Sequence, residues 1–379
     1  MKVLIAIDSF KGSISSIEGS EAIAEGVRAV YENAHIVTLP LADGGEGTVD
    51  TLVQATGGEL VETRVTGPLN EKIIAVYGIL GDKKTAVIEV AAACGLPLVP
   101  KGQRNPLLTT TYGVGELIVD AIENGCNNFV VGLGGSATND AGVGMLQALG
   151  CRFIDSEQKE VSRGGQGLKN ICEINTENIH PALINTTFNI ACDVNNPLYG
   201  LNGAAYIFGP QKGASDKMAK ELDQGLKHFA EVVLFKLGRD IHNIKGAGAA
   251  GGLGAAFAGF LHAELKSGID LILEHVKMEK HMSDVDFVIT GEGKLDGQTS
   301  MGKAPFGVAQ LAKKNGIPVI ALAGGVTKET RSLNDHGVTS YFSIMNAPMS
   351  LEDAVNVETT YSNLKSTTEQ LFRLIRAVR

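Results

Sequence analysis

Val3-Leu-Ile-Ala-Ile7, followed directly by Asp8-Ser-Phe-Lys-Gly-Ser13, opens the chain. A continuous apolar run of this kind is typical of a strand that is buried on both faces of a parallel sheet. A helical pattern follows from about 16 to 31, then a strand at 35–39 and a helix from about 48 to 55. This β-α-β-α order predicts an α/β fold with a parallel sheet.

The last third of the chain repeats this alternation of buried strands and helices. The expected strands are 287–290, 319–323 and 341–344, and the expected helices are 303–314, 333–336 and a long closing helix at 351–378. The two ends of the sequence are therefore expected to form one doubly wound parallel domain.

The middle of the chain has a different pattern. Between 60 and 90, apolar and polar residues alternate around turns at 67–70 and 81–84, which predicts antiparallel strands. The other expected elements are helices at 112–124, 140–149, 217–237 and one ending near 265, and strands at 129–133, 152–154 and 189–193. We therefore expect one domain at 1–59 plus 270–379, with about 100–148 as a further candidate segment, and an inserted α/β domain with a mixed sheet at 60–269.

Composition excludes several classes of partner. The 379 residues carry a net charge of −9, no Trp and 5% aromatic residues, so a nucleic-acid partner is not expected. The five cysteines form no Cys-x-x-Cys motif, as in proteins of a reducing compartment. An acid at Asp8 interrupts the first apolar run, and glycines interrupt the longest one at 247–261. We expect a cytoplasmic protein without a signal peptide or a membrane partner.

Five stretches place glycines beside acids and small hydroxyl residues where strands are expected to end. They are Leu41-Ala-Asp-Gly-Gly-Glu-Gly-Thr48, Gly132-Leu-Gly-Gly-Ser-Ala-Thr-Asn-Asp140, Cys192-Asp-Val-Asn-Asn-Pro197, Gly246-Ala-Gly-Ala-Ala-Gly-Gly-Leu-Gly254 and Thr290-Gly-Glu-Gly-Lys-Leu-Asp-Gly-Gln-Thr299. Glycine lets a backbone approach a ligand, and free N–H groups attract phosphate. Carboxylates beside such loops would repel phosphate unless a divalent cation lies between them. The combination indicates a site for a metal–nucleotide complex.

The second stretch has competing interpretations. Gly132-x-Gly134-x-x-Ala137, with Asp155 about twenty residues later, is close to a dinucleotide fingerprint and would fit an NAD(P)-dependent oxidoreductase acting on a small hydroxy acid. Asp140 opposes a bare pyrophosphate, but it could hold a cation or simply cap a helix. The chain has no Walker-type loop and neither His-Arg-Asp nor Asp-Phe-Gly, so a kinase here must belong to another lineage. A nucleotide-sensing module without catalysis is a third alternative.

The other stretches also have structural alternatives. Lys11 follows the first strand, where open α/β sheets bind ligands, although any lysine can be a surface residue. The glycines at 246–254 fit either a loop over a nucleotide or tight helix packing. Asp193 could accept a hydroxyl proton or hold Mg²⁺, whereas an Asx turn explains Asn196 well. The acids and lysines at 292–303 could form a solvated salt-bridge cluster, but the density of glycine favours a site.

Taken together and in this order, these stretches resemble the bacterial glycerate kinase family. Its signatures are Asp8–Ser13, Leu41–Thr48, Gly134–Asp140, Cys192–Leu198, Gly209-Pro-Gln-Lys-Gly-Ala214, Gly248–Gly254, Thr290–Asp296 with Gln298-Thr299, and Gly302–Pro305. The resemblance covers essentially the whole chain, with one departure: Ala141 stands where Gly is commoner. It implies ATP-dependent phosphorylation of D-glycerate, usually at the 2-hydroxyl. It also implies a flavodoxin-like domain interrupted by a second α/β domain, with the site in the cleft.

The roles of individual residues are hypotheses from residue type and position. Asp193 is the expected base, and Lys11 and Lys303 would neutralise phosphate or carboxylate charge. The expected substrate contacts are Asp8, Ser9, Asp43, Gly44, Gly45, Glu46, Asn196, Gln298 and Thr299. The expected nucleotide contacts are Gly134, Gly135, Ser136, Ala137, Thr138, Gly251, Gly252, Gly254 and Lys303. Asp140, Glu292 and Asp296 are the expected Mg²⁺ ligands, and the sequence leaves a homo-oligomer open.

Overall fold

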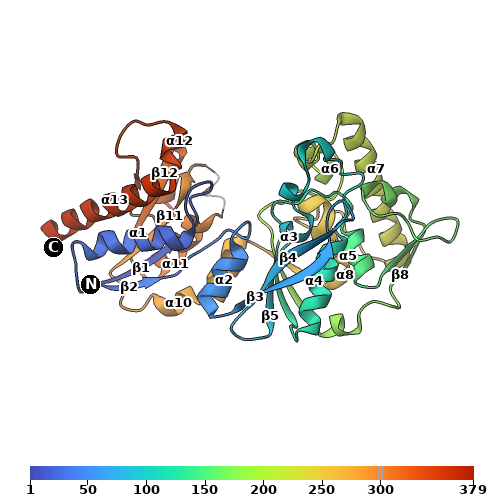
Figure 1. Ribbon diagram of the computed structural model, residues 1–379, viewed down its shortest axis with the longest axis horizontal. Helices are drawn as coiled ribbons and strands as arrows, with labels where there is room; N and C mark the ends of the chain where they lie inside the picture. The colour runs from blue at the N-terminus through green and yellow to red at the C-terminus, as the bar shows by residue number, and fades with distance from the viewer. Residues whose placement is uncertain (298, 300–301) are drawn as a thin grey trace. The chain divides into compact units, whose positions relative to one another are not determined.

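The computed structural model describes residues 1–297, 299 and 302–379. Its internal contacts divide the chain into two units (Figure 1). Unit 1 consists of Met1–Asp43, Gln54–Thr56 and Gly268–Arg379, and unit 2 consists of Gly44–Val53 and Gly57–Ser267. Residues 100–148 therefore belong to unit 2.

Unit 1 is built on a five-stranded sheet in which all neighbours are parallel, in the order β13-β12-β11-β1-β2. The strands are β1 Lys2–Ile7, β2 His35–Thr38, β11 Phe287–Leu295, β12 Val319–Val326 and β13 Ser340–Ser343. Counted within this unit, the order is 2-1-3-4-5, which is that of flavodoxin-like sheets. The predicted doubly wound parallel sheet is confirmed. Its order reverses between β1 and β11, and ligands bind at the carboxyl ends of strands at such a reversal.

Helices cover the sheet of unit 1 (Figure 1). They are α1 Ser16–Arg28, α9 Gly268–His275, α10 Met278–His281, α11 Ala304–Lys314, α12 Leu351–Ala354 and α13 Val357–Val378. Alternate residues of β1 share a core with apolar residues of α1 and α13, while α11 packs against β11 and β1. α1 begins in a capping box, in which the Ser15 hydroxyl accepts a hydrogen bond from Glu18 N–H and the Glu18 carboxylate accepts one from Ser15 N–H.

Three predicted elements of unit 1 differ from the structure. The helix expected at 333–336 is instead a 3₁₀ helix at Lys328–Asn334. β11 does not end at Thr290 but continues to Leu295, because the glycines after Thr290 lie in the strand rather than in a turn. A Cβ atom on Gly291 would lie 2.3 Å from the Leu322 carbonyl of β12, so glycine lets the two backbones approach. The closing helix is interrupted, since Asn356 caps a second helix with a side-chain hydrogen bond from Thr359 N–H.

Unit 2 contains a six-stranded mixed sheet in the order β10-β9-β6-β5-β4-β3, and a small two-stranded sheet, β7-β8. The strands are β3 Glu59–Thr66, β4 Lys72–Ile79, β5 Thr85–Glu89, β6 Asn128–Gly132, β7 Arg152–Ile154, β8 Glu173–Asn175, β9 Thr187–Ala191 and β10 Glu264–Lys266. The predicted antiparallel strands between 60 and 90 are confirmed as β3, β4 and β5. β5, β6, β9 and β10 are parallel, so their carboxyl ends lie at one edge.

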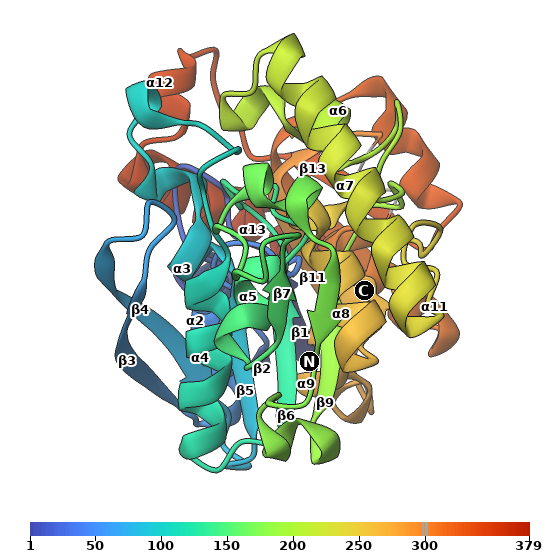
Figure 2. The same cartoon turned by 90° about the vertical axis from the view of Figure 1, so that its right-hand side faces the viewer.

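The helices of unit 2 are α2 Thr48–Thr56, α3 Ala91–Cys94, α4 Tyr112–Glu123, α5 Val143–Ala148, α6 Ala204–Phe208, α7 Asp216–Leu237 and α8 Leu253–Leu261, with the last three residues of α2 counted in unit 1. Figure 2 shows α4, α5 and α8 in front of β5, β6 and β9. Their apolar residues form one continuous core with this face of the sheet. Within the described part of the chain, no helix is long and apolar enough to span a membrane.

The helix predicted at 140–149 starts later than expected, at Val143. Ala141 and Gly142 before it have φ of +54° and +71°, which no helix can include. The positive φ of Ala141 gives a physical reason why glycine suits this position, since a Cβ atom disfavours the left-handed region.

Candidate functional site

Five charged residues gather at the carboxyl edge of the unit 1 sheet, at the reversal between β1 and β11. We call them the acid–lysine cluster; they are Asp8, Lys11, Asp43, Glu292 and Lys303. Asp8 directly follows β1, and its N–H donates to the Gly291 carbonyl of β11 at 2.9 Å. The structure thus brings together five residues that were predicted for the site, and their roles stay predictions.

Asp8 is a buried carboxyl group. Only 3% of the residue is exposed, and burial raises the pKa of Asp8 from 3.8 to about 7, with the negative charge of Asp43 adding to the effect. Lys11 and a hydrogen bond from Ser9 N–H at 2.6 Å oppose this shift. Near neutral pH this site therefore holds a carboxyl group that titrates.

Lys11 lies beside these acids. Its Nζ donates to Asp43 Oδ2 at 2.9 Å. Burial opposes the charged form of Lys11, but the hydrogen bond to Asp43 and the charges of the nearby acids outweigh it and raise the Lys11 pKa. Gly293 of β11 packs against this loop, since a Cβ atom there would lie 3.4 Å from Lys11 N. Lys11 thus stays cationic over the working pH range.

Glu292 lies inside β11 and connects to the next helix. Its carboxylate accepts a hydrogen bond from Thr299 Oγ1 at 2.5 Å and lies 3.7 Å from Lys303 Nζ. Burial raises the Glu292 pKa, although Thr299 and Lys303 lower it. Asp296 is nearby, with its N–H donating to Thr299 Oγ1 and its carboxylate 3.8 Å from Lys294 Nζ. Gln298, a predicted substrate contact, lies outside the described residues.

The chemistry of this cluster suits a cation and a hydroxy acid. Three carboxyl groups at one sheet edge repel each other when they are ionised. A positive charge that binds between them reduces this repulsion and favours the ionised carboxylates. Among the described residues no group of three or more His, Cys, Asp or Glu forms a ready-made metal site. Mg²⁺ needs only one or two carboxylates when substrate phosphates and water complete its shell. Two carboxylates are therefore enough in number, and the role of Glu292 and Asp296 as Mg²⁺ ligands stays a prediction.

A second group of predicted residues lies at the carboxyl edge of the unit 2 sheet. We call residues 132–140 the glycine loop; it begins at Gly132, the last residue of β6. The segment that precedes α2 packs on it: a Cβ atom on Gly132 would lie 2.3 Å from the Gly44 carbonyl, and one on Gly134 would lie 3.3 Å from Gly45 Cα. Glu46, which was predicted with Gly44 and Gly45, is exposed.

Asp140 ends the glycine loop, and its carboxylate is fully buried. It accepts hydrogen bonds from Thr111 N–H and Thr111 Oγ1, both at 2.9 Å, and from Gly142 N–H and Gly144 N–H. Burial raises the Asp140 pKa, and these four hydrogen bonds lower it. These hydrogen bonds connect the residue before α4 with the residues at the start of α5, which is a structural role for the carboxylate. The role of Asp140 as a Mg²⁺ ligand stays a prediction.

Gly251 packs directly on the glycine loop, and Gly252 packs on Ala141, which follows the loop. Ala141 N–H donates to the Gly251 carbonyl at 3.0 Å. A Cβ atom would lie 2.0 Å from the Thr138 carbonyl at Gly251 and 2.6 Å from Ala141 Cα at Gly252. Tight backbone packing, one of the two sequence interpretations, therefore describes this segment. Any contact with a nucleotide would come in addition to it.

This packing gives a stability prediction with a matched control. Gly251→Ala is expected to lower the free energy of unfolding by about 3 kcal/mol or more, because a left-handed alanine adds to a clash with Thr138. Gly57→Ala is the control: Gly57 has φ +66°, against +70° for Gly251, but no heavy atom lies within 4 Å of its Cβ position. Its cost should be about 1–2 kcal/mol. Urea unfolding measures both, and equal losses would show that the packing contributes nothing.

Asp193, the predicted base, lies two residues beyond the carboxyl end of β9 and is exposed. Its neighbour Cys192 is partly buried, and burial raises the pKa of this thiol, with the Asp193 charge adding to the rise. Cys192 therefore stays protonated and does not compete as a base. Asn196 is used locally, since its Nδ2 donates to the Asn202 carbonyl at 2.8 Å.

Comparisons with known proteins show the family of this chain. A family model described as the glycerate kinase family matches residues 3–376. The chain belongs to the glycerate kinase family. It is 49% identical to the "Glycerate kinase" of Bacillus subtilis and to the "Glycerate 2-kinase" of Escherichia coli, in each case over 93% of both chains. A solved structure titled "Crystal structure of putative glycerate kinase 2 from Salmonella typhimurium LT2" matches with a TM-score of 0.91 and 43% identity, covering 100% of this chain and 98% of that chain.

The dinucleotide interpretation does not fit this glycerate kinase family member. A fingerprint requires the glycine loop to open a helix directly, but α5 begins only at Val143. Asp155 follows β7 of the small sheet, and its carboxylate accepts hydrogen bonds from Glu157 N–H and Lys159 N–H within a turn. None of the relatives named above is an oxidoreductase.

Sequence reasoning missed Lys212, which the fold of this family member brings to the glycine loop. Lys212 is buried, and its Nζ donates to Ser136 Oγ at 3.0 Å and to the Thr138 carbonyl at 2.7 Å. The available signal was its place in the signature at 209–214. No strand end pointed to it, because it belongs to a short 3₁₀ helix, Pro210–Lys212.

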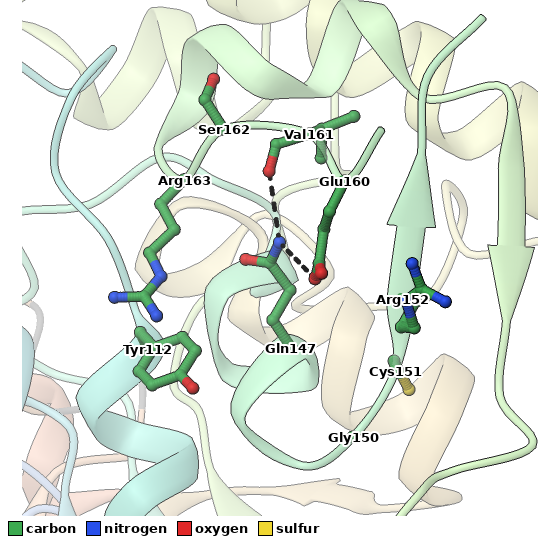
Figure 3. Close-up of a pocket in the computed structure, with 9 residues that line it drawn as sticks. All are labelled: Tyr112, Gln147, Gly150, Cys151, Arg152, Glu160, Val161, Ser162 and Arg163. Carbon is green, nitrogen blue, oxygen red and sulfur yellow. Dashed lines mark hydrogen bonds between the residues drawn. The ribbon is translucent and has the colours of Figure 1, made fainter. Parts of the chain in front are cut away.

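Unit 2 of this family member also has an open pocket of about 430 Å³ that the sequence did not predict. Figure 3 shows Arg163 and Tyr112 on one side and Gln147 with Glu160 in the middle. The Arg163 guanidinium lies 3.4 Å from the centre of the Tyr112 ring, and Gln147 Nε2 donates to Glu160 Oε1 at 3.2 Å. None of the residues predicted for the site lines this pocket.

Proposed function

We propose that this protein is a glycerate kinase that transfers the γ-phosphoryl group of ATP to the 2-hydroxyl of D-glycerate, giving 2-phosphoglycerate and ADP. The observation that carries the proposal is the family match over residues 3–376. The name of the relative from Escherichia coli, "Glycerate 2-kinase", supports the choice of the 2-hydroxyl. The acid–lysine cluster supports the same chemistry, because phosphoryl transfer needs groups that hold a metal ion and neutralise charge.

We assign the acceptor to the edge of the unit 1 sheet. Lys11 would bind the glycerate carboxylate, and Asp8, Ser9, Asp43 and Thr299 would bind its hydroxyl groups. Mg²⁺, when bound, supplies charge neutralisation for the phosphates, and Glu292 and Asp296 would hold it. Lys303, at the start of α11, would neutralise phosphate oxygens. The glycine loop would contribute backbone donors to the nucleotide.

The bond changes are those of an in-line displacement. The glycerate oxygen forms a bond to the γ-phosphorus while the bond from this phosphorus to the β–γ bridging oxygen of ATP breaks, and ADP leaves with the electron pair. The hydroxyl proton passes to Asp193. The side chains position the reactants and stabilise charge, and the rate enhancement comes from these two effects.

The proposal is tested by measuring ADP release from Mg-ATP with and without D-glycerate. Release should depend on D-glycerate, and phosphorus NMR of the product should show a phosphate on the 2-carbon. Glycerate-independent ATP binding without release would favour a sensing module. Tighter binding of NADH than of Mg-ATP would favour the oxidoreductase, and a phosphate on the 3-carbon would correct the position of transfer.

We also place the reaction in the cytoplasm, where ATP is available. The five cysteines are free thiols in the structure, which supports a reducing compartment.

A further inference from the structure

Lys212 is a buried lysine held rigidly in unit 2. Only 3% of it is exposed. It ends the helix Pro210–Lys212, and Gly213 follows with φ +93°. A Cβ atom on Gly213 would lie 2.5 Å from the Arg104 carbonyl, so the turn after Lys212 packs tightly on the loop that carries Arg104. Backbone packing directly after Lys212 therefore helps to fix its position.

The ammonium group of Lys212 lacks an opposite charge in direct contact. Among the described residues its Nζ donates only to the Ser136 hydroxyl and the Thr138 carbonyl, and no carboxylate lies within 4.0 Å. Burial lowers the Lys212 pKa from 10.5 to about 8, and electrostatic interactions with Cys94 and then Asp140 oppose this only in part. A buried charge without a counter-charge is costly.

Other polar groups in the segments that contact Lys212 are also unsatisfied. Asn139 is 1% exposed, and neither its Oδ1 nor its Nδ2 has a hydrogen-bond partner in the part of the chain that is described. Within the same limits, Arg104 Nε is buried without an acceptor. Buried polar groups normally have partners. The donors Asn139 Nδ2 and Arg104 Nε, in segments that contact Lys212 or the turn after it, therefore have room for an acceptor that the described residues do not supply.

We propose that Lys212, assisted by Arg104, binds an anionic oxygen group of a substrate at the glycine loop. The shared chemistry is that of a phosphate of the nucleotide or the carboxylate of the acceptor. A lysine is a compact charge that suits such oxygens, and its Nζ has three donors, of which two are used. The anion supplies the missing charge and accepts the third hydrogen bond. This inference rests on the proposed function and adds a binding residue to it.

If Lys212 had only a structural role, its positive charge would not be needed. A neutral amide could donate to Ser136 or to the Thr138 carbonyl without the cost of a buried charge. Lys212→Gln therefore keeps the capacity for hydrogen bonds and removes the charge, and Lys212→Met removes both.

The test measures the affinities of the full chain for ADP, D-glycerate and inorganic phosphate separately by titration calorimetry. Both Lys212 variants should bind one of these probes about ten- to a hundredfold more weakly than the wild type. Loss for ADP and phosphate would identify a phosphate site, and loss for D-glycerate alone would identify a carboxylate site. Lys220→Met, on the exposed face of α7, is the control and should bind all three normally. Unchanged affinities in a folded Lys212→Met would overturn the proposal.

Two further measurements keep the test decisive. If neither Lys212 variant folds, Arg104→Gln takes their place: weaker binding of one probe supports the proposal, and normal binding of all three rejects it. The wild type separates this inference from the function on which it rests. A wild type without glycerate-dependent ADP release means that the proposed function fails, whereas an active wild type with fully binding variants means that only the Lys212 assignment fails.

Discussion

Asp193→Asn is expected to lower kcat about a hundredfold or more, because the glycerate hydroxyl then loses its proton acceptor. Asp193 is exposed at the end of β9, and the neighbouring thiol of Cys192 stays protonated because burial raises its pKa, so no adjacent group replaces the lost base. The variant keeps the shape of the side chain, and the fold should be unaffected. Steady-state ADP release at saturating ATP and D-glycerate measures the effect.

The control for this experiment is Asp216→Asn. Asp216 is also exposed and belongs to unit 2, but it lies in the first turn of α7 and has no assigned role. Its replacement should change stability by only a few tenths of a kcal/mol and leave kcat unchanged. Near-normal turnover in Asp193→Asn would remove Asp193 as the base, and equal losses in both variants would show that the effect is not local.

Asp8→Asn is expected to make the protein more stable at alkaline pH. The folded pKa of Asp8 is about 7, above its ordinary value of 3.8, so the folded state holds this proton more tightly than the unfolded state. The stability that this group contributes is therefore fully present below about pH 4, falls as the pH rises to about 7, and is level above that. At pH 8 the ionised Asp8 costs up to about 4 kcal/mol, which the neutral Asn avoids.

Urea unfolding at pH 5 and pH 8 measures this difference. The advantage of Asp8→Asn over the wild type should grow by roughly 3 kcal/mol between these two values. Asp286→Asn is the control, because the pKa of Asp286 is shifted in the opposite direction. A hydrogen bond from Lys2 N–H and a second one from Arg379 lower it. The free energy of unfolding of that variant should not exceed that of the wild type at pH 8. An advantage of Asp8→Asn that does not change with pH would contradict the buried ionisation of Asp8.

A stabilised but inactive Asp8→Asn would indicate a site selected for binding at the expense of stability. Functional sites commonly carry such local costs. For Asp8 the cost arises from burial and from Asp43, and both are consequences of placing acids at the reversal of the strand order.

Much of the fold could be predicted because buried parallel strands have a strong local signal. Continuous apolar runs located β1 and the start of β11, and alternation located β3 to β5. Local sequence patterns failed to predict the end of β11, because the glycines there permit close packing against residues that are distant in the sequence. Gly291 and Gly293 have the composition of a turn, yet they lie in β11 because the backbone of β12 and the loop at Lys11 approach them closely.

The unit 1 part of the site could be predicted because strand ends identify a sheet edge. Asp8 directly follows β1, and Glu292 lies in β11. The two strands are neighbours in the sheet, so their pairing brings these residues together. Lys212 could not be found in this way, since it reaches the glycine loop through packing between segments more than 70 positions apart. The hydrogen bonds of Asp140 with Thr111 depend on a similar long-range contact.

The pairing of β1 with β11 has a consequence for biosynthesis. Lys2 N–H donates to Asp286 across 284 sequence positions, and α1 packs on α13 near the other end of the chain. At roughly 5–20 residues per second, the first strand leaves the ribosome tens of seconds before its partner exists. Unit 2 can complete its own sheet during this delay, while β1 has β2 and α1 beside it but still lacks its later neighbours β11 and α13. Cotranslational folding must therefore protect the amino-terminal segment from aggregation until the ribosome has finished most of the polypeptide.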